Sequence, residues 1–358
     1  REELPDGRSV VILHTRLSIL DTTELAAQPF HSGDTVLSFN GEIFNYRELR
    51  DDLCAQGAKF RSDGDTEVLS QLLVREKIDA LDRCEGMWAF AFYSRSDRTL
   101  ILSRDRFGEK PLYLFRTLEG LYFASEIKTL RILSGRKFSP NLDQLRRYLV
   151  NGYKSLYKSN ATFFQNVEEL SPGHCLTVEA SGVIKSRCYW RPNFEQQDDS
   201  ISFLEAVEGT REALSRSVEL RLRSDVPLAF CLSGGVDSNA LVGIAKNILG
   251  ADVHGFTILN TDERYEEADL VDHAVKEFGI RHTVVPIERK HFLDKLRQLI
   301  RIHDAPVYTI TYFAHWLLMQ AIADEGYKVV LSGTGADELF SGYYDHHNAY
   351  LSVMRGTD

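Results

Sequence analysis

The sequence predicts two domains of different fold class: an α+β domain rich in strands, followed by an α/β domain with a parallel sheet. The first observation is length, because 358 residues exceed what one ordinary hydrophobic core needs. The second is a change of pattern along the chain. Short apolar runs bounded by Gly, Asp, Asn and Ser fill the first half, whereas the second half alternates apolar strands with helical patterns.

The first half contains short apolar segments typical of strands and one helical segment. Strands are predicted at residues 10–13, 36–39, 88–93 and 99–102. Leucine and valine at helical spacing predict a helix over residues 65–75. A late hairpin is predicted over residues 174–189, with its turn at 180–182.

A polar segment marks the boundary between the two domains. Residues 191–202 contain a proline and show no hydrophobic periodicity, which is typical of a linker. We therefore assign residues 1–192 to the first domain, 193–202 to the linker and 203–358 to the second domain. In the second domain, strands are predicted at 227–232, 253–259, 282–287 and 328–331, and helices at 239–249 and 266–278. Such alternation predicts helices on both faces of a parallel sheet.

Composition argues against several functional classes. The net charge of −10 at pH 7 does not suit a protein that coats nucleic acid or an anionic membrane. The sequence has no run of about 18 apolar residues, so no membrane span is predicted. The five cysteines have neither CxxC nor zinc-ligand spacing, which is typical of reduced thiols in a cytoplasmic protein.

The strongest motif lies at residues 233–238, directly after a predicted strand and at the start of a predicted helix. Its residues are Ser233, Gly234, Gly235, Val236, Asp237 and Ser238. Backbone N–H groups and the helix start favour phosphate, and the two serines add hydroxyl donors. Asp237 would repel phosphate unless Mg²⁺ lies between them. The motif lacks the Gly-Lys-Ser/Thr of a Walker A loop.

A second acidic turn follows another predicted strand, in the sequence LSGTGADE at residues 331–338. Parallel strands of one sheet end at the same edge, where ligands bind. Asp337 is therefore expected to face Asp237 across a metal-bound pyrophosphate. Taken alone, this segment is equally typical of a surface turn.

Five segments carry a resemblance to a known family. They are HTRLSI (14–19), FNGEIFN (39–45), DTE (65–67), SRDRFGEKPLY (103–113) and SDVP (224–227), the last leading into SGGVDS. Together they resemble the glutamine-hydrolysing asparagine synthetases over nearly the whole chain. The resemblance implies that the first domain is a class II glutamine amidotransferase domain with the αββα sandwich fold of the N-terminal-nucleophile type. A Rossmann-like ATP-pyrophosphatase domain that uses ATP and Mg²⁺ would follow it.

The resemblance also implies site residues. Arg16 would bind the glutamine carboxylate, Asp65 and Glu42 its ammonium group, and Asn40 with the Gly41 N–H the oxyanion. The full glutamine-binding set is Arg16, Leu17, Ser18, Ile19, Asn40, Gly41, Glu42 and Asp65. Leu232, Ile258, Ser332 and Gly333 would join residues 233–238 around ATP, with Asp237 and Asp337 as metal ligands. Asn-Gly is also the commonest hairpin-turn signal, so a turn at Asn40-Gly41 stays open.

Three departures from the family pattern are visible. The family's nucleophile is a cysteine at the mature N-terminus, whereas this chain begins with Arg1, and a lysine-bearing C-terminal region is absent. We expect truncation at both ends, and natural loss of the glutaminase, which would leave an ammonia-using enzyme, is the alternative for the missing cysteine. In either case the chain as given would not hydrolyse glutamine. Thr334 also stands where the family has an acidic residue credited with proton transfer. The segment 304–310, which corresponds to the acceptor region, matches only in part.

The expected function is ATP-dependent amidation of a carboxylate through an acyl-adenylate, with ammonia from glutamine. Aspartate is the first-choice acceptor, and AMP and pyrophosphate are released. One alternative is an amidotransferase for a sugar uronic acid or a secondary metabolite. Another is a non-catalytic regulator that binds glutamine or ATP. The expected partners are glutamine, ATP and the acceptor, without nucleic acid or membrane, and a homodimer stays open.

Overall fold

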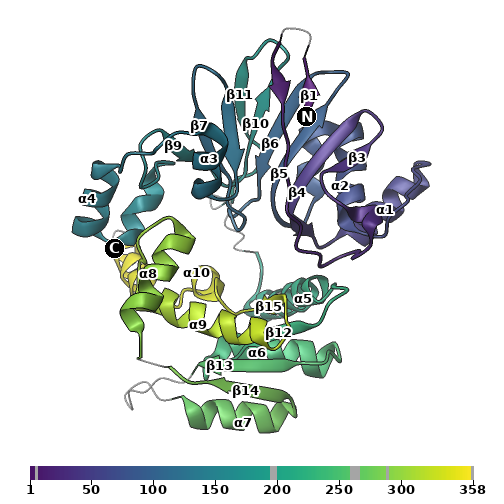
Figure 1. Ribbon diagram of the computed structural model, residues 1–358. Helices are drawn as coiled ribbons and strands as arrows, with labels where there is room; N and C mark the ends of the chain where they lie inside the picture. Colours follow the sequence, from purple (N-terminus) through teal and green to yellow (C-terminus); the bar gives the residue numbers. More distant parts are fainter. Residues whose placement is uncertain (5–6, 194–199, 259–266, 288–289, 356–358) are drawn as a thin grey trace. The chain divides into compact units, whose positions relative to one another are not determined.

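The computed structural model describes residues 1–4, 7–193, 200–258, 267–287 and 290–355 (Figure 1). It divides into two compact units. Unit 1 comprises Arg1–Ile201 and Asp294–Thr309, and unit 2 comprises Ser202–Leu293 and Ile310–Asp358. Residues 194–199 of the predicted linker, residue 259 of a predicted strand and residue 266 of a predicted helix lie outside the described residues.

Unit 1 is built on a six-stranded antiparallel sheet of order β11-β10-β6-β5-β4-β3. Its strands are β3 (Phe30–Ser32), β4 (Thr35–Ile43), β5 (Gly86–Ser94), β6 (Thr99–Arg104), β10 (His174–Val178) and β11 (Ile184–Cys188). One face packs against α1 (Tyr46–Ala55) and α2 (Asp65–Glu76). The centre of this core is Trp88, which is fully buried together with Leu69 and Leu72.

The other face of this sheet packs against a second β layer. Alternate residues such as Ala89, Ala91 and Leu102 contact Leu112 and Leu114 there. This layer contains the sheet β8-β7-β9 and the strand pair β1-β2. Its strands are β1 (Glu2–Glu3), β2 (Ser9–Val10), β7 (Tyr113–Arg116), β8 (Leu121–Ala124) and β9 (Val167–Glu169), and α3 (Ile127–Ser134) packs on it through the core that includes Leu130. The predicted αββα order of layers is confirmed.

Several predicted elements of unit 1 differ in extent. The strand predicted at residues 10–13 is wrong for most of its length, because β2 ends at Val10 and the chain then runs without strand pairing. The hairpin at 174–189 is present, and its turn uses the left-handed Gly182 (φ +86°). The remaining helices of unit 1 are η1 (Glu24–Ala26), η2 (Lys77–Arg83), α4 (Leu142–Asn151) and η3 (Tyr153–Lys158).

A segment from the second half of the sequence packs within unit 1. The Lys128 backbone N–H donates to Asp304 Oδ2 (3.0 Å) at the start of α3. The Tyr148 hydroxyl donates to the Val307 carbonyl (3.1 Å), and Tyr308 stacks on Tyr153 with 9° between the ring planes. The half-buried residues 304–308 therefore pack against α3, α4 and η3 as part of unit 1.

Unit 2 contains a parallel sheet of order β14-β13-β12-β15. Its strands are β12 (Leu228–Cys231), β13 (His254–Ile258), β14 (Arg281–Val285) and β15 (Val329–Leu331). Neighbouring residues of β12 point to opposite faces: Phe230 packs against α5 (Phe203–Arg221), α6 (Val236–Gly243) and α7 (Ala268–Phe278), whereas Ala229 packs against α9 (Ile310–Asp324). The predicted α/β class is confirmed.

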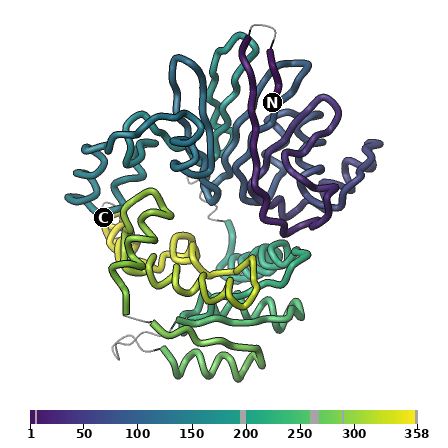
Figure 2. Tube along the Cα trace, viewed as in Figure 1, coloured from purple at the N-terminus to yellow at the C-terminus, as the bar shows by residue number. Residues whose placement is uncertain are grey.

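The start of α6 matters for the site that follows. The helix begins at Val236, three residues before the predicted start, with Gly235 as its N-cap, and continues as one π-helical stretch, η4 (Ile244–Ile248). The motif at 233–238 thus turns directly from strand into helix. This part of the chain is drawn in green between the teal and the yellow ends of unit 2 in Figure 2. The other helices of unit 2 are α10 (Ala336–Phe340) and α11 (Tyr344–Met354), whereas α8 (Phe292–His303) belongs to unit 1 from Asp294 onward.

Candidate active sites

A cavity of about 430 Å³ lies in unit 2 where β12, β13 and β15 end. Eight of the ten residues predicted to bind ATP line it: Leu232, Ser233, Gly235, Asp237, Ser238, Ile258, Ser332 and Gly333. The other two, Gly234 and Val236, do not line it, and Val236 is 82% exposed. The carboxyl edge of the parallel sheet therefore collects most of the predicted set in one place.

Hydrogen bonds within the loop 233–238 fix its shape. Ser233 Oγ lies 2.9 Å from Ser238 Oγ, and the Ser233 N–H donates to Ser238 Oγ (3.1 Å). The Gly235 N–H donates to Ser233 Oγ (3.2 Å), and Asn239 Nδ2 donates to the Ser233 and Gly235 carbonyls. The two serines that the motif supplies therefore close the turn on itself and hold its hydroxyls at the cavity wall.

The second predicted loop lies beside the first. β12 and β15 are parallel neighbours with Phe230 opposite Leu331, so the residues after each strand emerge together. A Cβ added to Gly333 would lie 3.2 Å from the Asp237 Cβ, which shows how closely the loops approach. The Thr334 and Ser332 hydroxyls lie 2.9 Å apart at this edge.

The two predicted metal ligands are placed differently. Asp237 lines the cavity, but Asp337 is not among the lining residues. The Asp337 side chain packs against Gly342, whose added Cβ would lie 2.9 Å from the Asp337 Cβ. Within the described ranges, no group of three or more His, Cys, Asp and Glu side chains is arranged to hold a metal ion. Asp237 and the neighbouring serine hydroxyls are oxygen donors, the type that Mg²⁺ accepts alongside phosphate oxygens.

Five lining residues were not predicted from the sequence: Cys231, Thr257, Glu267, His315 and Leu318. Thr257 Oγ1 donates to the Leu232 carbonyl (2.7 Å), which ties the ends of β12 and β13 together. Burial raises the pKa of the Cys231 thiol to about 11, so it stays protonated at neutral pH. Glu267 directly precedes α7 and His315 lies in α9, both far from the motif in sequence, and no local signal marks them.

In unit 1, strand β4 carries Asn40, Gly41 and Glu42. The hairpin turn that Asn40-Gly41 left open is wrong, because Asn40 pairs with Ala89 and Gly41 with Trp88 in the middle of the β4–β5 ladder. A Cβ added to Gly41 would lie 2.8 Å from the Trp88 Cα. Glycine is thus needed here for the close approach of two strands.

Asp65 is the first residue of α2 and is 4% exposed. Its Oδ2 accepts a hydrogen bond from the Ile43 N–H (2.8 Å), which joins the start of α2 to the end of β4. Burial raises the pKa of Asp65 to about 6, although backbone N–H groups and the charge of Arg16 act in the opposite direction. Asp65 is therefore a buried carboxyl with a raised pKa beside the predicted glutamine residues.

The segment 14–19 carries Arg16 and crosses beside β4. His14 Nδ1 lies 3.0 Å from Ser38 Oγ on β4, and burial together with the Arg16 charge lowers the pKa of His14. The Arg16 guanidinium donates to the Leu20 (2.8 Å) and Asp21 (2.7 Å) carbonyls. The other predicted residues of the segment differ in exposure: Leu17 is 61% exposed, whereas Ser18 and Ile19 are half-buried.

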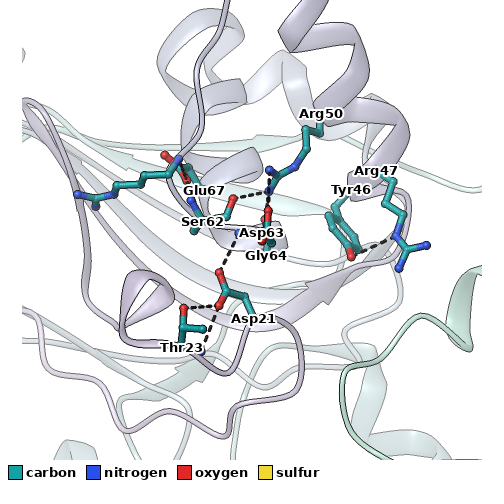
Figure 3. A network of polar contacts seen from close by, with 10 residues as sticks. Asp21, Thr23, Tyr46, Arg47, Arg50, Ser62, Asp63, Gly64 and Glu67 are labelled. Atoms are coloured by element: carbon teal, nitrogen blue, oxygen red, sulfur yellow. Dashed lines mark hydrogen bonds and ion pairs between the residues drawn. The ribbon is translucent and has the colours of Figure 1, made fainter.

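A polar network that the sequence did not predict holds the loop before Asp65 (Figure 3). Asp21, at a left-handed φ of +46°, accepts from Thr23 and from the Asp63 N–H (2.8 Å). Glu67 accepts from the Ser62 N–H (2.8 Å) and hydroxyl (2.6 Å). Arg50 donates to the Ser62 carbonyl (2.8 Å). Because this loop leads into α2, the network fixes where Asp65 begins the helix.

Comparison with known proteins covers both units. Residues 4–190 match a family described as a glutamine amidotransferase domain, and residues 209–357 match one described as asparagine synthase. "Asparagine synthetase [glutamine-hydrolyzing] 1" of Bacillus subtilis (strain 168) is 32% identical over 92% of this chain and 51% of its own length.

The chain belongs to the glutamine-hydrolysing asparagine synthetase family.

Relatives within this family carry different names. "Asparagine synthetase [glutamine-hydrolyzing] 3" of the same Bacillus is 30% identical over 98% of this chain and 59% of its own length. "Amidase chyE" of Penicillium rubens (strain ATCC 28089 / DSM 1075 / NRRL 1951 / Wisconsin 54-1255) is 27% identical over 95% of this chain and 53% of its own length. The chain thus spans about half the length of the curated relatives it matches. Among the helices that the structure describes, none combines the length and the apolar character needed to cross a bilayer.

Proposed function

We propose that the protein is an ATP-dependent amidotransferase that joins glutamine-derived ammonia to a carboxylate and releases AMP and pyrophosphate. One observation carries the proposal: the loops 233–238 and 332–334 meet at a single cavity where β12 and β15 end. This is the edge at which open parallel sheets bind ligands. Membership of the asparagine synthetase family supports the same chemistry.

The residues of this cavity suit the first step. The Ser233 and Ser238 hydroxyls and the start of α6 offer donors and positive charge to the pyrophosphate of ATP. A substrate carboxylate oxygen would attack the α-phosphorus, and the bond to the pyrophosphate oxygen would break. Asp237 would hold Mg²⁺ with phosphate oxygens, Asp337 is our second candidate ligand, and the ion would neutralise charge on the leaving pyrophosphate.

Ammonia would then attack the acyl carbon of the adenylate, AMP would leave, and the attacking nitrogen would lose a proton. In unit 1, Arg16 would bind the glutamine carboxylate, Asp65 and Glu42 its ammonium group, and Asn40 with Gly41 the oxyanion. Two contacts support this grouping: Ile43–Asp65 joins β4 to α2, and His14–Ser38 joins the segment 14–19 to β4.

The free cysteines fit a protein of the reducing cytoplasm, which is the localisation that we propose.

Aspartate is the first acceptor to test, and another carboxylate is the second. Two observations favour the second: Thr334 at the cavity cannot act as a base at neutral pH, and relatives include a protein named as an amidase. A regulator that binds nucleotide without turnover is a third outcome that the same assay detects.

The test uses the full-length protein with ATP, Mg²⁺ and ammonium, and measures AMP and pyrophosphate with and without aspartate. Aspartate-dependent AMP with asparagine formed would support an asparagine synthetase. AMP that depends on a uronic acid but not on aspartate would support the second acceptor class. Nucleotide binding without AMP in the presence of either acceptor would argue for a regulator.

Asp237→Ala provides the matched variant for this assay. It should reduce AMP formation at least about a hundredfold, because the carboxylate at the phosphate loop is lost. Asp252→Ala is the control, since Asp252 is exposed, pairs with Arg281 (2.8 Å) and does not line the cavity. Equal losses in both variants would refute the role of Asp237.

A further inference from the structure

We propose that the Glu267 carboxylate competes with the phosphates of the nucleotide for the loop 233–238. This inference rests on the proposed function, because it names what limits nucleotide binding at the same cavity. Glu267 is the residue before α7. It lines the cavity although it lies 33 residues after Gly234 in the sequence.

A direct hydrogen bond joins Glu267 to the loop. The Gly234 N–H donates to Glu267 Oε2 over 2.8 Å. A Cβ added to Gly234 would lie 3.0 Å from the Glu267 Cβ and 3.1 Å from the Leu270 Cβ, so the start of α7 packs closely on the loop. The packing of α7 therefore brings the carboxylate to this N–H group.

The three N–H groups at the start of the loop have partners of two kinds. Those of Ser233 and Gly235 donate to serine hydroxyls, whereas that of Gly234 donates to a carboxylate. A hydroxyl can rotate and donate its own proton to a phosphate, so it does not oppose nucleotide binding. A carboxylate only accepts, carries negative charge and repels phosphate, so it must leave before a phosphate oxygen takes its place.

This arrangement has a quantitative consequence for binding. The nucleotide binds only the fraction of molecules in which Gly234 is free of Glu267, and the apparent Kd rises as that fraction falls. Removing the carboxylate should therefore tighten binding. Loss of one charge-assisted hydrogen bond of ordinary strength, here between Gly234 and Glu267, should lower the apparent Kd for the nucleotide about 3- to 10-fold.

The experiment is calorimetric titration of the full-length protein with ATP plus Mg²⁺, with ATP plus EDTA, and with pyrophosphate alone. Glu267→Gln and Glu267→Ala are each expected to bind all three probes about 3- to 10-fold more tightly than the unmodified protein. The matched control is Asp269→Asn, which removes an equal charge from an exposed position on the same helix outside the cavity. It is expected to stay within about twofold of the unmodified protein.

Each other result overturns the inference in a recognisable way. Weaker binding by Glu267→Gln only with Mg²⁺ present would make Glu267 a metal ligand. Weaker binding by both Glu267 variants with every probe would make it a support for the loop. An equal gain in Asp269→Asn would reduce the effect to general charge. If the unmodified protein binds ATP but Glu267→Gln does not differ from it, this inference alone fails. If no form of the protein binds ATP, the proposed function fails as well.

Discussion

Gly333 and Asp237 lie in contact across the two loops of the cavity in unit 2. The added Cβ of Gly333 would be 3.2 Å from the Asp237 Cβ and 3.1 Å from the Ser238 backbone nitrogen. The second loop therefore supports the first one at the residue expected to face the metal–pyrophosphate group. This contact depends on the lack of a side chain at Gly333. The backbone of Asp237 and Ser238 could not move away from an added methyl group as a flexible side chain would.

Gly333→Ala should weaken ATP binding by about tenfold while lowering the free energy of unfolding by only about 1 kcal/mol. The reason is that a methyl group pushes the Asp237–Ser238 backbone by a few tenths of an ångström. Titration calorimetry and thermal unfolding measure the two effects. Gly209→Ala is the control, because that helical position in unit 2 has open space around it. Unchanged ATP affinity in Gly333→Ala would contradict the supporting role.

Gly41→Ala should destabilise unit 1 by about 2–4 kcal/mol, because the added Cβ meets the β5 backbone at Trp88. The strands must separate locally to accept it, which breaks part of the longest ladder in the sheet. Denaturant unfolding followed by circular dichroism measures the loss. Gly120→Ala, at an open position in the same unit, should leave stability within about 0.5 kcal/mol. Equal stability of the two variants would show that β4 and β5 adapt without cost.

The raised pKa of Asp65 predicts a pH-dependent stability term of known sign. Below about pH 4 the carboxyl is protonated in the folded and unfolded states, so it contributes no difference. As the pH rises to about 6, the unfolded chain ionises first, and folding loses about 3 kcal/mol from this group. Asp65→Asn lacks this term, so its unfolding free energy relative to the unmodified protein should increase between pH 4 and 6. A constant difference across that range would argue against the raised pKa.

The same titration should govern glutamine use in the full-length enzyme. The proposed contact of Asp65 with the glutamine ammonium requires an ionised carboxylate, so KM for glutamine should rise about tenfold for each pH unit below the pKa of about 6. Initial rates with glutamine, and with ammonium as the nitrogen source, separate this effect from changes in the other unit. A parallel loss of both activities would place the titrating group elsewhere.

Cysteine labelling should follow burial. Cys54 is exposed, whereas burial raises the pKa values of Cys84 and Cys175 to about 12. N-ethylmaleimide at pH 7.5 should therefore modify Cys54 first and reach Cys84 and Cys175 only with denaturant, as peptide mass spectrometry would show. Early modification of Cys84 would indicate that η2 opens in the folded protein.

Hydrophobic patterning predicted the second unit closely because its strands are short apolar runs, of which β12 and β13 are largely buried. The predicted strand ends lie within a few residues of β12, β13, β14 and β15. The same rule failed at residues 10–13, where Ile12 packs against the second β layer without strand hydrogen bonding. Apolar alternation reports burial, and burial does not require a ladder.

The candidate sites were predictable where local sequence and strand order determine them. The loops 233–238 and 332–334 follow adjacent parallel strands, so their meeting follows from topology. Glu267 and His315 reach the cavity through the packing of α7 and α9, which no local pattern encodes. Asp21 and Glu67 act in unit 1 through contacts with the loop 61–64, and these too exist only in the folded chain.

The placement of Asp304 and Tyr308 in unit 1 affects how such a protein can be assembled from modules. A gene fragment that stopped at Ile201 would encode the strands of unit 1 but not the residues that cap α3 and stack on Tyr153. A single recombination event between the two halves would separate these partners. Exchange of unit 1 for a homologous unit would therefore require the matching tyrosine-bearing segment to travel with it.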